Sequence, residues 1–126
     1  MKDIANPVDD EVREWAYSDA FEPMQDFDLI LAAELRPSYL EFVADQNCPK
    51  RTYFLKVLYL IIGDAVRTNY HTNTQDEISS YLGKAERAQA TELNSWLDRS
   101  RDLMRHPEKF DYDQWCAGGL VDDSQT

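Results

Sequence analysis

Residues 53–62 read Tyr-Phe-Leu-Lys-Val-Leu-Tyr-Leu-Ile-Ile, and Lys56 is the only plainly polar residue among the ten. A helix that is apolar on every side is normally buried at the centre of a helical protein. The preceding residues 47–49, Asn-Cys-Pro, combine a capping residue with a proline that suits the start of a helix. We therefore predict a central helix over 49–69, around which the rest of the chain packs.

Length and composition predict one folded domain. The chain has 126 residues, of which 43% are hydrophobic, and this is enough for a single core. We expect one helical domain over 1–126, with flexible tails at 1–5 and 120–126. The first residues lack an apolar run of signal-peptide length, and no segment approaches the ~20 apolar residues of a membrane span. A cytoplasmic location is the resulting expectation.

The charge is strongly negative and unevenly distributed. Twenty-four acidic and thirteen basic residues give a net charge of −11, of which residues 1–47 carry −9, whereas residues 48–70 carry +3. Such a charge argues against binding to nucleic acid or to an anionic membrane surface, because both need clustered cations. It would attract a basic protein partner. Negative charge also serves solubility alone, and the sequence leaves that alternative open.

The first half of the chain contains signals for three short helices. Asn6-Pro7 begins a helix over 7–17, whose inward face carries Val8, Val12, Trp15 and Ala16 at helical spacing. A second helix is expected over 23–35, although the alternation at 26–31 also permits a strand. No second convincing strand exists to pair with it, so we prefer the helix.

Two further breaks define the later helices. Because a residue before proline avoids the α region, Arg36-Pro37 ends the second helix, and a third begins at Pro37 or Ser38 and ends before Asn47. Residues 74–77, Thr-Gln-Asp-Glu, form a capping box at the start of a helical pattern that stays in phase to residue 105.

Residues 75–105 therefore form one long helix or two helices separated near Ala90-Thr91, and the polar stretch 86–92 favours the break. His106-Pro107 stops the pattern, and we expect the aromatic residues of 110–117 to fold back onto the core. The predicted fold is an all-α bundle of about five or six helices around the central helix.

The sequence suggests one surface for binding a partner. Four acidic residues gather within 19–28, and two aromatic residues lie in acidic surroundings where we expect them to be exposed. The candidate partner-binding residues are Asp19, Phe21, Glu22, Asp26, Asp28 and Tyr112. The same carboxylates could hold a divalent cation, but the glycine and ligand spacing of an EF-hand loop are missing. Acids at the start of a helix also need no ligand to explain them.

Few other residues suggest chemistry. His71 and His106 are the only histidines, and neither has helical metal-ligand spacing. Cys48 lies at a helix start beside cations, a setting that lowers a thiol pKa, but a buried and inert thiol is the competing interpretation. Cys116 is expected to pack in the core. The two cysteines match no zinc or redox spacing, so we predict reduced thiols and no disulfide framework.

The cations that flank the central helix suggest ion pairs. Lys50 and Arg51 lie at its amino end, where the helix dipole disfavours positive charge. We therefore expect Lys50, Arg51 and Arg67 to pair with acidic residues, in particular with those of the first 47 residues.

Taken together, these patterns predict no catalytic residue, metal-ligand set or cofactor motif. We expect a binding protein whose acidic face docks a basic protein partner. The alternatives are a small metal-binding helical enzyme that uses the carboxylates with a histidine, and a homodimer whose aromatic residues form the contact.

Overall fold

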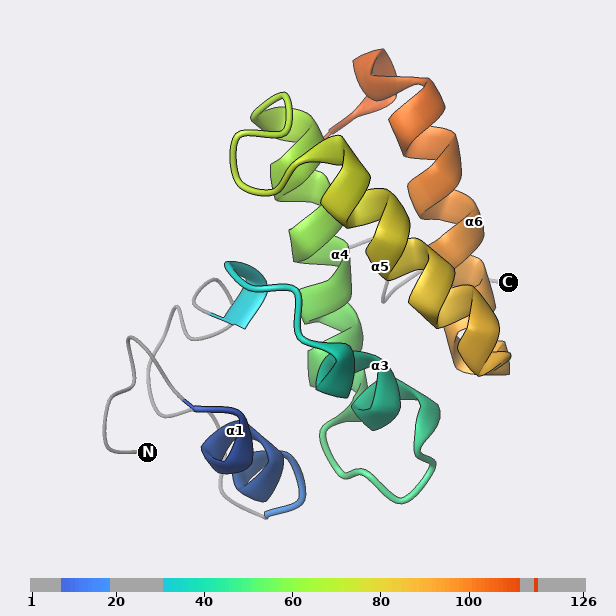
Figure 1. Cartoon of the computed structure of the whole chain (residues 1–126). Coiled ribbons are helices and arrows are strands. Elements are labelled where there is room, and N and C mark those ends of the chain that lie inside the picture. The colour runs from blue at the N-terminus through green and yellow to red at the C-terminus, as the bar shows by residue number, and fades with distance from the viewer. Residues whose placement is uncertain (1–7, 19–30, 112–114, 116–126) are drawn as a thin grey trace.

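The computed structural model describes residues 8–18, 31–111 and 115. Within them the fold is all-α, without a strand, as predicted (Figure 1). The helices are α1 (Asp9–Ala16), α3 (Pro37–Ala44), α4 (Arg51–Arg67), α5 (Gln75–Ala88), α6 (Thr91–Arg105) and the 3-10 helix η1 (Pro107–Lys109). In this described part of the chain, no helix is long and apolar enough to cross a membrane.

Helix α4 is the central element of the bundle. It contacts α3, α5 and α6, and Figure 1 shows its green ribbon running behind α5 and beside α6. All residues from Val57 to Gly63 are buried, which is possible only for a helix covered on every side. The preceding Tyr53, Leu55 and Lys56 are only partly buried, so the apolar run is fully enclosed only in its second half.

Helix α1 is shorter than predicted. It begins at Asp9, because Val8 adopts an extended backbone and donates its N–H to the Glu11 carboxylate over 3.3 Å. Val8 is therefore a capping residue, and its side chain is 59% exposed rather than buried. Val12, Trp15 and Ala16 are buried, as the helical spacing predicted.

The segment before α3 confirms the predicted break at proline. Arg36 has φ −90° and ψ 124°, the extended backbone that a following proline imposes, and Pro37 opens α3. Of the predicted helix over 23–35, residues 23–30 lie outside the described residues. Leu31 and Ala32 are helical and are followed by a turn, so this helix ends before Leu35.

Residues 75–105 form two helices, α5 and α6, rather than a single long one. The capping box at the start of α5 is present: Glu77 N–H donates to Thr74 Oγ1 over 3.2 Å, and Thr74 N–H donates to the Glu77 carboxylate over 3.0 Å. Helix α5 ends where Gln89 turns into the left-handed region at φ 53°, and Ala90 is extended. The break predicted near Ala90-Thr91 is thereby confirmed.

Aromatic residues near the C-terminal end pack on α4. The Trp115 indole donates from Nε1 to the Tyr59 carbonyl over 2.6 Å, and Phe110 packs against the same core. Gly63 permits this approach, because a Cβ added there would lie 2.7 Å from Trp115 Cδ1. The predicted return of the aromatics is confirmed for Phe110 and Trp115, whereas Tyr112 lies outside the described residues.

Candidate functional site

None of the predicted partner-binding residues can be placed by the structure. Asp19, Phe21, Glu22, Asp26, Asp28 and Tyr112 all lie outside the described residues. The elements on either side of residues 19–30 are described, however, and they carry the same excess of negative charge. The candidate site is therefore built from those elements.

We call the carboxylates of α1, α3 and their flanking turns the acidic surface. Residues 8–18 and 31–47 carry seven acidic residues and two arginines. Helices α1 and α3 contact each other, so their charges share one end of the molecule (Figure 1). All seven acidic residues are exposed or partly exposed: Asp9, Asp10, Glu11, Glu14, Glu34, Glu41 and Asp45.

The two arginines of this region are both engaged by carboxylates. Arg13 of α1 pairs with Glu41 of α3 over 2.7 Å, and this bond is the first cause of a raised Arg13 pKa. Arg36 lies 2.9 Å from Glu34 and 3.5 Å from Asp9. These pairs connect α1 to α3, and because their carboxylates are more than half exposed, each contributes little to stability.

A hydrogen bond between Tyr17 and Asp45 lies at the same end of the molecule. The Tyr17 hydroxyl donates to Asp45 Oδ2 over 2.7 Å, and Asn47 N–H donates to the other carboxylate oxygen over 2.8 Å. The Tyr17 hydroxyl and then the Asn47 N–H lower the pKa of Asp45. The same bond, followed by desolvation, raises the pKa of Tyr17 to about 12. Asp45 is thus stabilised as the carboxylate and Tyr17 as the neutral phenol.

Lys50 attaches the end of α1 to the start of α4. Its side chain is buried, and Nζ donates to the Trp15 carbonyl over 2.7 Å and to the Ser18 carbonyl over 2.5 Å. The ammonium also lies 4.6 Å from the centroid of a Trp15 ring, in a cation–π contact. A cation at the carboxyl end of a helix is favoured by the dipole. This contact gives Lys50 a role that the sequence did not suggest.

The other flanking cations pair differently from the expectation. Arg51 forms an ion pair of 2.9 Å with Glu92 of α6, and its Nε donates to the Val43 carbonyl over 3.1 Å. Among the described residues, the acidic partner of Arg51 therefore lies on α6 and not within the first 47 residues. Arg67 pairs with Asp64, one turn earlier on α4, over 3.1 Å. The break before Thr91 explains the first pair, because it brings the start of α6 back to the start of α4.

Cys48 is a buried thiol rather than a reactive one. It is 3% exposed and free of any disulfide, and its Sγ lies 3.5 Å from the Ala16 carbonyl. Burial raises the pKa of the Cys48 thiol, and this outweighs the opposing effects of the Lys50 N–H and of the nearby cations. The activated-thiol alternative is therefore wrong. Cys116 lies outside the described residues.

The histidines do not assemble a recognisable centre within the described residues. His106 Nδ1 lies 3.6 Å from Glu108, two residues along the chain, and both side chains are well exposed. His71 is exposed in the turn between α4 and α5. Over residues 8–18, 31–111 and 115, no three histidine, cysteine or carboxylate side chains come together as metal ligands.

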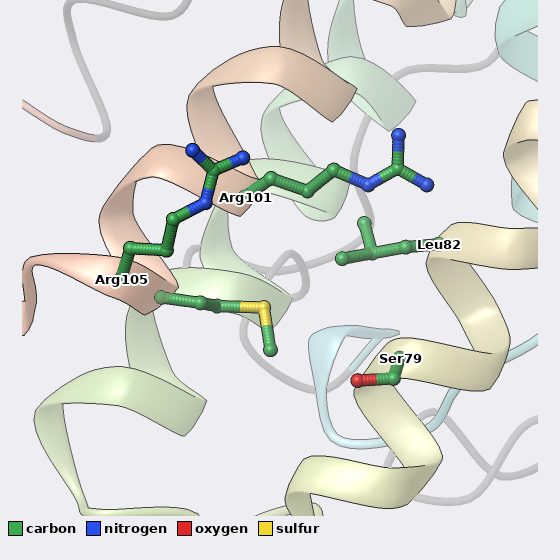
Figure 2. Close-up of a pocket in the computed structure, with 5 residues that line it drawn as sticks. Ser79, Leu82, Arg101 and Arg105 are labelled. Atoms are coloured by element: carbon green, nitrogen blue, oxygen red, sulfur yellow. The ribbon is translucent and has the colours of Figure 1, made fainter.

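A groove between α5 and α6 was not predicted. It has a volume of about 330 Å³ and is lined by Ser79 and Leu82 of α5 and by Arg101, Met104 and Arg105 of α6. Figure 2 shows Arg101 reaching from α6 toward α5, above Leu82, and it pairs there with Glu86. The sequence signal was the spacing of Arg101 and Arg105, which places two cations one turn apart on one helix.

Comparison with known proteins gives no relative from which a function could be transferred. No family model, curated protein or solved structure matches the chain. The functional proposal therefore rests on the charge and geometry of the residues themselves.

Proposed function

We propose that this protein is a cytoplasmic binding protein whose acidic surface, on α1 and α3, docks a basic protein partner. The observation that carries the proposal is the segregation of charge. Seven carboxylates against two arginines lie in residues 8–18 and 31–47, whereas the described residues from 48 onward have nine acidic and ten basic side chains. A one-signed surface steers an oppositely charged partner and disfavours wrong ones.

Part of the acidic surface is already neutralised within the chain. Glu41 and Glu34 hold arginines, and Asp45 holds the Tyr17 hydroxyl. Asp10 and Glu14 instead lie exposed one turn apart on α1. Carboxylates at this spacing present a continuous anionic stripe to the lysines or arginines of a partner. We therefore assign Asp10 and Glu14 the leading part in the proposed contact.

The test is affinity capture with the full chain and a charge-reversed variant, Asp10→Lys with Glu14→Lys. The captured proteins should have basic isoelectric points by mass spectrometry, and the variant should lose them. The matched control is Asp98→Lys with Asp102→Lys, since these exposed acids have the same spacing on α6 and the same charge change. Circular dichroism should show unchanged helix content in both variants.

Two outcomes would contradict the proposal. One is that both variants retain the same partners, because the acidic surface would then be irrelevant to capture. The other is that the captured proteins are not basic. A second variant, in which Asp19, Glu22, Asp26 and Asp28 are reversed, tests whether the contact extends into the residues between α1 and α3.

A further inference from the structure

We propose that the groove between α5 and α6 binds an acidic segment of a partner protein, which places a leucine-like side chain against Leu82 and Met104. The groove has the composition for such a ligand. Leu82 is almost fully buried and forms apolar lining, Met104 is partly buried, and the two charged lining residues, Arg101 and Arg105, are both cations. This surface is separate from the acidic surface on α1 and α3.

Arg105 determines the sign of the ligand, because Arg101 is already paired with Glu86. Arginine presents a planar fork of donors that matches a carboxylate in a bidentate arrangement. Arg101 is positioned by its pair with Glu86, so one guanidinium is held across the top of the groove (Figure 2). Arg105 follows one turn later, is exposed, and has no carboxylate partner among the described residues. It can therefore accept a carboxylate from outside.

The shape of the groove favours a protein segment over a small molecule. Small-molecule sites normally enclose most of the ligand surface. This groove is open to solvent, because only side chains on the facing sides of two helices line it. An amphipathic helix can instead lay its apolar face into such a groove while its charged residues meet the rim. Methionine suits this role, since its flexible thioether adapts to the inserted side chain.

The test uses a fluorescein-labelled acidic peptide with leucine at i, i+3, i+4 and i+7 and glutamate elsewhere, titrated with the full chain by fluorescence anisotropy. We expect binding, and we expect Arg105→Glu to weaken it about tenfold or more, because a hydrogen-bonded charge pair is replaced by repulsion. Arg105→Lys should retain part of the affinity, since it keeps the charge but loses the fork. A peptide with serine in place of leucine should bind more weakly than the parent.

The matched control is Arg87→Glu, which makes the same charge change at an exposed position of α5 outside the groove lining. It should leave the affinity within about twofold, because only the net charge of the chain changes. Equal weakening by Arg87→Glu and Arg105→Glu would overturn the proposal, as would an absence of peptide binding. So would light scattering that shows self-association of the wild-type chain abolished by Arg105→Glu, because the occupant would then be a second copy.

Discussion

Helix α1 and the α5–α6 pair are attached to the rest of the molecule by different chemistry. The pair is held by a broad apolar interface that includes Tyr81 and Trp96, whose rings meet edge to face at 6.3 Å. Helix α1 contributes only three buried side chains, Val12, Trp15 and Ala16. Its other attachments are mainly polar, through Lys50 at its end, Arg13–Glu41 along its side, and Tyr17–Asp45 beyond it.

The difference matters because apolar area is lost gradually, whereas each polar contact depends on a single group and its charge. A small element held by few buried contacts opens locally more easily than the core does. Helix α1 also carries much of the acidic surface. We infer that the part of the molecule proposed to meet a partner is attached less firmly than the helices that support it.

The largest expected effect tests the apolar attachment of the α5–α6 pair. Trp96 is completely buried in α6, so Trp96→Ala removes a large core side chain and leaves a cavity. We expect a loss of about 3–5 kcal/mol in the free energy of unfolding, measured by urea denaturation. The exposed Asn94→Ala in the same helix is the control and should change stability by less than about 0.5 kcal/mol. A Trp96→Ala loss below about 1 kcal/mol would contradict the assigned core position.

Replacing Lys50 tests the polar attachment of α1. Lys50→Met keeps an apolar stem of similar length but leaves the Trp15 and Ser18 carbonyls without the ammonium donor. Hydrogen exchange should show the opening free energy of α1 falling by about 2 kcal/mol, because two hydrogen bonds from a charged donor are lost, although Ser18 still donates to the Trp15 carbonyl. Amides of α5 and α6 should be affected less. Lys84→Met, at an exposed position of α5, is the control. If Lys50→Met reduces protection equally in α1 and α6, the two regions are not attached differently.

The capping box offers a smaller and strictly local effect. Thr74→Ala removes the oxygen that accepts the Glu77 N–H and should cost about 1 kcal/mol. Hydrogen exchange should show the loss in the first turn of α5, with α1 unchanged. Thr74→Ser keeps the hydroxyl and should retain most of the stability. A loss of the same size in Thr74→Ser would show that the methyl group, rather than the cap, matters.

Much of the fold follows from local rules that the sequence displays. The apolar run over 53–62, the proline at position 37 and the capping box at 74–77 each impose a backbone choice within a few residues, and the structure has all three. The start of α1 was less predictable. The Val8 N–H bond to the Glu11 carboxylate moves the helix start by two residues and turns an apolar residue outward.

The site was less predictable, because it depends on contacts between distant residues. Nothing local to Lys50 indicates that it binds carbonyls more than thirty residues earlier. The pair between Arg51 and Glu92 requires the break between α5 and α6 and the return of α6 toward α4. The direction of the Cys48 pKa shift could not be predicted either, because it is decided by the burial of the thiol, which only the fold shows.

The smallest expected effect concerns pH, and it distinguishes the response of α1 to acid from that of the α5–α6 pair. The pKa of Asp45 is lowered in the folded chain, first by the Tyr17 hydroxyl, so its stabilising contribution is present above the ordinary value of 3.8 and is lost as pH falls through the lower folded value. Below 3.8, hydrogen exchange of α1 should accelerate. Asp45→Asn should remove this part of the pH dependence, and Asp10→Asn should keep it.

The α5–α6 pair provides the internal reference for this acid response. Glu77 also has a lowered pKa, first through the Thr74 N–H, so acid weakens the start of α5 in the same direction. Only the first turn of α5 depends on that carboxylate, whereas the buried residues from Ile78 to Ala85 do not titrate there. We therefore expect acid to loosen all of α1 but only the first turn of α5. If both helices lose protection along their whole length at the same pH, the two attachments do not differ as proposed.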